Sequence, residues 1–143
     1  MNKISITFTL PTSAKPEQIW SYYTKLSLRQ LWETDLENFL FFGELKTGVQ
    51  GIFKLRNVPE MPVTLSKVII NQEFTEEFNM PDIGVLSFSH QIVNLSQNQY
   101  ALKSEIALRP EQKLDAKSSY AFLKQISDDI IDKAYALNHL VES

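Results

Sequence analysis

Three polar residues fall on the otherwise apolar side of three consecutive predicted strands, and their types are those that carry out acid–base chemistry. They are Glu76, His90 and Ser104. A histidine can accept or donate a proton near neutral pH, and a neighbouring carboxylate can hold its ring in place. The same groups can instead form the polar end of an apolar pocket and orient a ligand's carbonyl or hydroxyl group. Glu76 and His90 are therefore candidate catalytic residues, and His90 and Ser104 are candidate ligand-binding residues.

The combination of serine, histidine and glutamate does not by itself predict a hydrolase triad. Ser104 lies in the middle of a predicted strand, with no strained turn and no oxyanion-hole donors indicated around it. A structural interpretation is also open, in which His90 is a cavity-wall histidine hydrogen-bonded to Ser104 or water and Glu76 lies near a strand end in solvent. If Glu76 is buried, its pKa should rise unless a charged His90 lies beside it.

Alternating apolar and polar residues predict the strands that position these groups, over residues 73–80, 85–95 and 99–108. A three-residue loop between the last two strands sets His90 opposite Ser104 and Phe88 opposite Ile106. For the first two strands, a five-residue loop would place Glu76 opposite His90. A three-residue loop would offset them by one pair, so the sequence leaves this register open.

The remaining shorter elements precede these strands. The pattern predicts a half-buried strand from Met1 to Leu10, helices over about 13–23 and 27–33, and strands over 36–42, 49–56 and 63–70. The second helix is expected to turn Leu28, Leu31 and Trp32 inward. Seven antiparallel strands and three helices make this an α+β chain.

One long amphipathic helix is predicted from Asp115 to Val141, with Asp115 as its N-cap and His139 on its water-facing side. Such a helix is on the order of 40 Å long, and a seven-stranded sheet can cover it by curling around it. Its predicted inward face contains Ala116, Tyr120, Leu123, Ile126, Ser127, Ile130, Ala134, Leu137 and Val141. The small side chains of Ala116, Ser127 and Ala134 predict that space remains between helix and sheet.

Composition and charge disfavour several classes of protein. The chain has 143 residues, 43% of them apolar, no cysteine and a net charge of −3. This length predicts a single domain over residues 1–143. Scattered Lys and Arg residues disfavour a nucleic-acid partner, and no apolar run approaches the roughly 20 residues of a membrane span. Because the first strand does not resemble a signal peptide, we expect a cytoplasmic protein, either a monomer or a weak homodimer.

Metal and cofactor sites are not predicted. The two histidines, His90 and His139, lie in elements that face opposite ways, and no cysteine can complete a zinc site. The sequence also lacks an HExxH motif and a phosphate-cradling glycine loop. We therefore expect no metal and no cofactor.

Over its whole length the chain resembles the SRPBCC superfamily, which includes START-like and Bet v 1-like proteins and has a helix-grip fold. The resemblance rests on the opening strand and the Ala14-Lys15-Pro16-Glu17-Gln18-Ile19-Trp20 segment after it, on Trp32, on the glycine-spaced stretch 43–53, and on Gly84-Val85-Leu86-Ser87-Phe88-Ser89-His90. It is greatest for the small bacterial polyketide cyclase/dehydrase-like branch. The polar segment 109–112 and the acidic Glu76 depart from the family's pattern.

The resemblance implies that a cavity between the sheet and the last helix binds a hydrophobic small molecule or lipid, without covalent chemistry. The expected ligand-binding residues are Trp32, Phe41, Phe53, Phe78, Phe88, His90, Ser104, Tyr120, Ser127 and Ala134. Two alternatives stay open: a cyclase/aromatase-like enzyme using His90 and Glu76, and a protein-interaction module of the chaperone-activator type. An apolar cavity with a polar tip favours binding, about 3 Å between Glu76 and His90 favours catalysis, and a filled cavity with an exposed apolar patch favours interaction.

Overall fold

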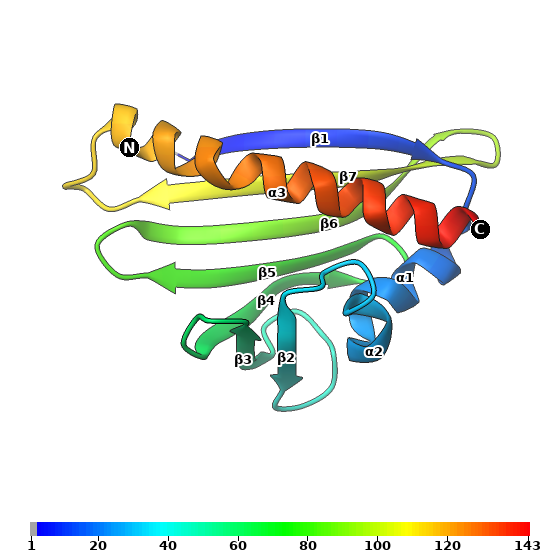
Figure 1. The fold of residues 1–143 in the computed structure, drawn as a ribbon, viewed down its shortest axis with the longest axis horizontal. Helices are drawn as coiled ribbons and strands as arrows, with labels where there is room; N and C mark the ends of the chain where they lie inside the picture. Colours follow the sequence, from blue (N-terminus) through cyan, green and yellow to red (C-terminus); the bar gives the residue numbers. More distant parts are fainter. Residues whose placement is uncertain (1–2) are drawn as a thin grey trace.

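The computed structural model describes residues 3–143, and its elements follow the predicted order (Figure 1). They are β1 (Ile4–Thr12), α1 (Pro16–Thr24), α2 (Leu26–Arg29), β2 (Leu36–Phe41), β3 (Gln50–Leu55), β4 (Met61–Ile69), β5 (Glu73–Met80), β6 (Gly84–Ser96), β7 (Gln99–Pro110) and α3 (Ala116–Glu142). Met1 and Asn2, which belong to the first predicted strand, lie outside the described residues. The main difference is α2, which is shorter than predicted, so that Trp32 lies in the turns that follow it.

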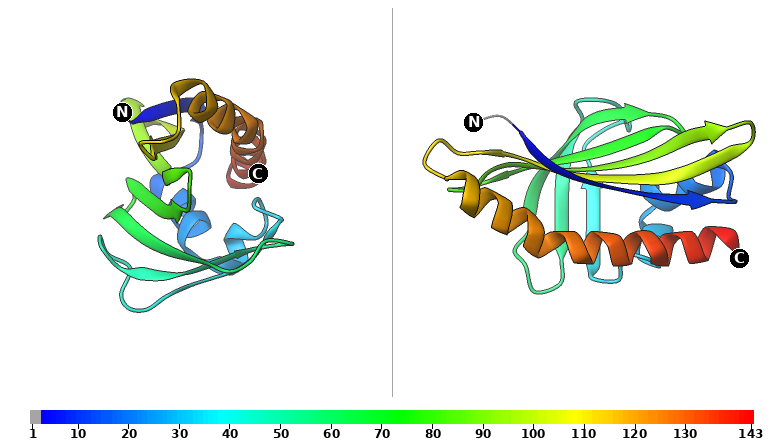
Figure 2. Two further views of the ribbon diagram at one scale, coloured as in Figure 1. Left: turned by 90° about the vertical axis from the view of Figure 1, so that its left-hand side faces the viewer. Right: turned by 90° about the horizontal axis from the view of Figure 1, so that it is seen from above.

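The seven strands form one antiparallel sheet in the order β1-β7-β6-β5-β4-β3-β2, so the first strand pairs with the last. Figure 2 shows that this sheet curls, with α3 running along one side of it and α1 and α2 at one end. The predicted α+β helix-grip fold is therefore confirmed. Helix α3 packs against β7 and β1, at one edge of the sheet.

The strand register decides how the three polar residues are arranged. Between β6 and β7, His90 pairs with Ser104 and Phe88 pairs with Ile106, as predicted. Between β5 and β6, Met80 pairs with Gly84 across a three-residue loop. Glu76 consequently lies opposite Phe88, one pair away from His90. Such diagonal neighbours are still within reach of long side chains.

Helix α3 begins as predicted, because the Asp115 side chain accepts a hydrogen bond from the Ser118 amide at 2.7 Å. The buried stripe is narrower than the predicted inward face and contains Ser119, Leu123, Ala134, Leu137 and Val141. Tyr120 is 56% exposed, since it lies about 100° around the helix from Ser119. Ala116 is also exposed, in the first turn. No helix within residues 3–143 is long and apolar enough to cross a membrane.

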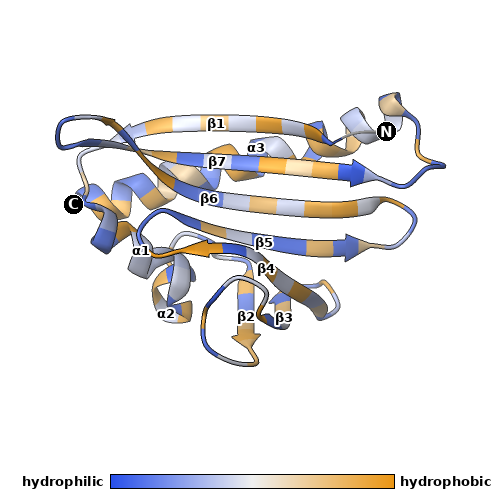
Figure 3. Ribbon diagram, turned by 180° about the vertical axis from the view of Figure 1, so that it is seen from behind, coloured by the Kyte–Doolittle hydropathy of each residue, from blue (hydrophilic) through white to orange (hydrophobic). Residues whose placement is uncertain are grey.

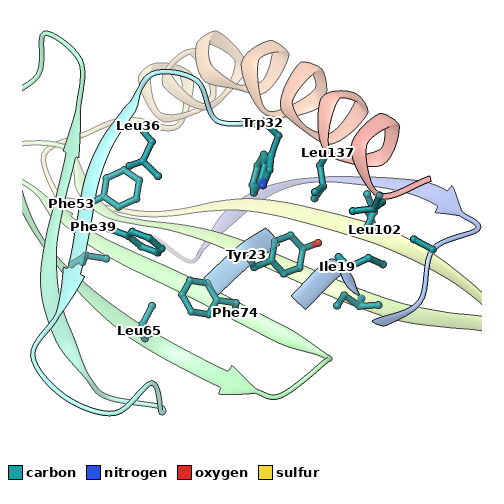
Figure 4. Close-up of a cluster of buried hydrophobic side chains, with 14 of the residues drawn as sticks. Ile19, Tyr23, Trp32, Leu36, Phe39, Phe53, Leu65, Phe74, Leu102 and Leu137 are labelled. Carbon is teal, nitrogen blue, oxygen red and sulfur yellow. The ribbon is translucent and has the colours of Figure 1, made fainter. Parts of the chain in front are cut away.

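The apolar core lies between the curled sheet and the helices. Figure 4 shows Tyr23, Trp32 and Phe74 in this region together with Leu102 of β7 and Leu137 of α3. Trp32, as expected for a buried indole, donates a hydrogen bond from Nε1, to the Tyr22 carbonyl at 2.9 Å. From behind, Figure 3 shows polar and apolar residues alternating along the outer strands, the pattern of a sheet with one solvated face.

Candidate functional site

A cavity of about 310 Å³ lies between the sheet and α3. Seven of the predicted ligand-binding residues line it: Trp32, Phe53, Phe78, Phe88, His90, Ser104 and Ala134. Most of the other lining side chains are apolar, including Met61, Met80, Leu86, Phe122, Ile130 and Leu137. The cavity thus has apolar walls. The role of these residues in binding a ligand stays a prediction.

Three of the predicted ligand-binding residues lie away from the cavity. Phe41 packs instead against the core, with its ring 5.4 Å from that of Phe39 and 6.1 Å from that of Phe74. Tyr120 is exposed on α3. The Ser127 hydroxyl donates to the Lys124 carbonyl in its own helix at 2.9 Å. These placements differ from the prediction because the assumed inward arc of α3 was too broad and because β2 lies at the sheet edge.

A buried ion pair between Arg29 and Glu76 forms the polar end of the cavity. Nη1 of Arg29 donates to Oε2 of Glu76 at 2.9 Å, and Nη2 donates to Oε1 at 2.6 Å. Each residue is only 1% exposed. This bidentate geometry is the strong form of the guanidinium–carboxylate interaction. Glu76 is therefore not at a solvated strand end, as one of the interpretations from sequence had it.

The remaining groups around Arg29 complete its coordination. Nε donates to Oε1 of Glu33 at 2.8 Å, four residues further along the chain, and Nη1 lies 3.4 Å from the Tyr23 carbonyl. The turn after α2 keeps helical hydrogen bonding to the Glu33 amide, so both side chains emerge on the same face. The guanidinium also lies 5.3–6.0 Å from four aromatic rings: Trp32, Phe39, Phe53 and Phe74. These cation–π contacts surround a charge that is removed from water.

His90 joins this network through one of its ring nitrogens. Its Nε2 lies 3.1 Å from Oε1 of Glu76. Because an ionised carboxylate only accepts hydrogen bonds, Nε2 must carry the proton and donate it. The ring lies between Tyr23 and Trp32, with centroid distances of 5.2 Å and 5.9 Å. His90 thus bonds to Glu76, not to Ser104, although Ser104 is its cross-strand partner.

Burial and the charge of Arg29 together set the ionisation of Glu76 and Tyr23. Burial would raise the pKa of the Glu76 carboxyl, but the charge of Arg29 and the hydrogen bonds from His90 and Arg29 outweigh burial and lower it to about 2. Burial raises the pKa of the Tyr23 hydroxyl well above its ordinary value, against the opposing effect of Arg29. Glu76 is consequently a fixed carboxylate that orients His90, and Tyr23 stays a neutral phenol. The sequence-based expectation named only His90 as a group that could prevent a rise in the Glu76 pKa, whereas Arg29 contributes most to lowering it.

A second set of ion pairs lies where α3 meets the turn after α2. Nζ of Lys133 lies 3.5 Å from Oε2 of Glu33, 3.1 Å from Oδ1 of Asp35 and 2.9 Å from Oδ2 of Asp129. All four residues line the cavity. Burial would lower the pKa of Lys133, but the three carboxylates outweigh burial and raise it. Lys133 therefore links α3 to the segment that carries Glu33 and Asp35.

Sequence reasoning missed Arg29, Glu33 and Lys133. Lys133 pairs with Asp129 four residues before it on α3, and this local spacing does not indicate that it also reaches Glu33 and Asp35. In the second predicted helix, Leu31 was expected to face inward but is 54% exposed, and Arg29 takes the buried side. The usable signal was the four-residue spacing of Arg29 and Glu33 beside Trp32, together with an inward-facing Glu76 that requires a cation.

No protein-family model and no curated protein match the sequence, but solved structures do match the fold. Ara h 8.0201 is 8% identical over 98% of each chain, with a TM-score of 0.70. Truncated norcoclaurine synthase from Thalictrum flavum is 14% identical over 98% of this chain and 94% of its own, with a TM-score of 0.64. A conserved protein of unknown function from Enterococcus faecalis is 20% identical over 99% of this chain and 72% of its own, with a TM-score of 0.62. At 8–20% identity, these similarities show that the chain shares its helix-grip fold with these structures.

Proposed function

We propose that this helix-grip domain binds a small hydrophobic molecule in the cavity between the sheet and α3, without covalent chemistry. The observation that carries the proposal is a cavity of about 310 Å³ with apolar walls and a buried, internally paired polar end. A packed core does not leave such a space, because interiors approach the density of organic crystals. A concave apolar site with a few convergent polar groups is the usual form of a ligand site.

The size of the cavity limits the ligand. The cavity has a volume of about 310 Å³. It lies at the lower end of the range of known ligand pockets, about 300–1,000 Å³. A one- or two-ring compound or a short acyl chain fits this space better than a complete membrane lipid.

Filling the cavity from α3 tests the proposal. Ala134 lines the cavity and is 5% exposed, whereas Ala136 lies on the solvent side of the same helix. Ala134→Leu should weaken the binding of naphthalene by at least about fivefold, because the added carbons compete for the ligand's space. Ala136→Leu adds the same atoms outside the cavity and should leave affinity unchanged. Calorimetric or fluorescence titration measures both, and equal affinities for the two variants would contradict the location of the site.

A second candidate function is proton transfer by His90, as in a cyclase-like enzyme. The specific observation is the 3.1 Å contact between Nε2 of His90 and Oε1 of Glu76, which holds the ring in one orientation. Nδ1 would then act as the base. Benzoylacetone in deuterated water should exchange its α-hydrogens faster with the native protein than with His90→Phe. Equal exchange rates, measured by proton NMR, would leave no support for this function.

The interaction-module alternative has less support. It predicts a filled cavity, whereas the cavity between the sheet and α3 is open. It retains one supporting feature, the exposed apolar side chains of Leu40 and Phe42 in and after the edge strand β2. Single exposed apolar side chains are common on folded proteins, so this feature alone does not favour a docking role.

A further inference from the structure

We infer that the ligand is a hydrophobe with a neutral or cationic hydrogen-bond donor, not a carboxylate, and that this donor binds Nδ1 of His90. The inference rests on the proposed function and specifies the chemistry of the ligand's polar group. Two independent features carry it. One is the unused nitrogen of a buried histidine, and the other is the balance of charge around the cavity.

The first feature is the free nitrogen of His90. The Nε2 proton is donated to Glu76, so in the neutral ring Nδ1 presents a lone pair and can only accept. Within residues 3–143, no hydrogen bond is made to Nδ1. His90 is 9% exposed and lines the cavity. Nδ1 is not among the fully buried polar atoms without a partner in the described chain. Nδ1 therefore keeps some accessible surface, on a residue that lines the cavity.

The second feature is the balance of charge around the cavity, in which each cation already has carboxylate partners. Arg29 makes four hydrogen bonds with its five N–H groups, to Glu76, Glu33 and the Tyr23 carbonyl, and its Nη2 also lies 3.5 Å from Nε2 of His90. Lys133 is surrounded by three carboxylates. Both cations of the lining are thus already paired with carboxylates of the protein. The hydroxyls of Tyr23 and Ser104 can donate or accept, so they do not change this preference.

The charges of the lining point the same way. Two cations, Arg29 and Lys133, face four carboxylates, so the lining has a formal charge of −2 when histidine is counted as neutral. The carboxylates are Glu33, Asp35, Glu76 and Asp129. A carboxylate ligand would enter this field without a partner, and an unpaired charge in an apolar site is strongly unfavourable. A hydroxyl or ammonium group can instead donate a hydrogen bond to Nδ1 of His90, and the negative charge of the lining favours such a donor.

Naphthalene derivatives with one skeleton and different polar groups test the inference. 2-Naphthol should bind the native protein about three- to tenfold more tightly than 2-methoxynaphthalene, which accepts hydrogen bonds but cannot donate. 2-Naphthoate should bind more than about tenfold more weakly than naphthalene. Tightest binding of 2-naphthoate, or equal binding of 2-naphthol and 2-methoxynaphthalene, would overturn the inference but keep the proposed function. If naphthalene itself does not bind, both are wrong.

Two variants test which protein group accepts the hydrogen bond that the ligand donates. His90→Phe keeps a ring of similar shape and removes Nδ1, so 2-naphthol and 2-methoxynaphthalene should then bind equally. Unchanged affinity for naphthalene shows that the cavity of this variant is intact. Ser104→Ala removes the other polar group on the adjoining strand and should preserve the preference for 2-naphthol. Loss of the preference in Ser104→Ala and its persistence in His90→Phe would show that the assignment to His90 is wrong.

Discussion

Replacing Arg29 by methionine should reduce the free energy of unfolding by about 3–5 kcal/mol, the range measured when one partner of a buried ion pair is removed. The reason is the carboxylate left behind, because Glu76 is 1% exposed and receives both of its closest charge-assisted hydrogen bonds from Arg29. Domains of this size are typically stable by about 5–15 kcal/mol. In chemical denaturation at neutral pH, the denaturant concentration at the midpoint should therefore fall strongly. A variant that is already partly unfolded without denaturant would show the same loss of stability.

Two further variants separate this effect from loss of packing. Arg109→Met makes the same substitution at a side chain that is 60% exposed and 3.6 Å from Glu77, and should change stability by less than about 0.5 kcal/mol. The double variant Arg29→Met, Glu76→Met removes both charges and should recover most of the lost stability, since well-packed apolar pairs often replace buried ion pairs without loss. If the double variant is as unstable as Arg29→Met, the uncompensated charge is not the cause.

The ion pair also shows which parts of the structure were predictable from sequence. The strands around Glu76, His90 and Ser104 alternate clearly, so local patterning predicted their inward faces and the register of β6 and β7. Arg29 is 47 residues from Glu76 and comes from a four-residue helix. Its inward orientation depends on how α2 docks against the sheet, and no local period encodes that docking. The buried position of Arg29 is therefore set by tertiary contacts.

The long helix illustrates the same limit within one element. Its N-cap at Asp115 and its extent follow from local hydrogen bonding and were predicted. Which residues at the margins of its apolar arc are buried depends on the neighbours of α3, and these are β7 and β1 at one edge of the sheet. Ala134 lies on the buried stripe and lines the cavity, whereas Tyr120 and Ser127 do not reach the cavity.

Acid should destabilise the protein through Glu76, and this is the second large expected effect. The pKa of Glu76 is lowered from 4.5 to about 2 in the folded protein. Because the pKa of Glu76 is lower in the folded protein than in the unfolded chain, the unfolded chain takes up the proton at a higher pH than the folded protein does. The stabilisation is therefore fully present above about pH 5, and roughly 3 kcal/mol of it is lost progressively as pH falls from 5 to 2. Urea unfolding at a series of pH values measures this loss as a falling midpoint.

Two single substitutions to glutamine, at neighbouring positions of β5, test whether the acid sensitivity comes from the Glu76 carboxyl. Glu76→Gln should be less stable at neutral pH, but its stability should fall less between pH 5 and 2, since the titrating group is gone. Glu77→Gln, on the outward face of the same strand, should keep the full loss. Asp115 and Glu142 also have lowered pKa values, because the backbone amides of Ser118 and Ser13 donate hydrogen bonds to them. Both remain in each variant, so their contribution cancels in the comparison. Equal acid slopes for Glu76→Gln and the native protein would mean that Arg29 does not hold Glu76 ionised in the folded state.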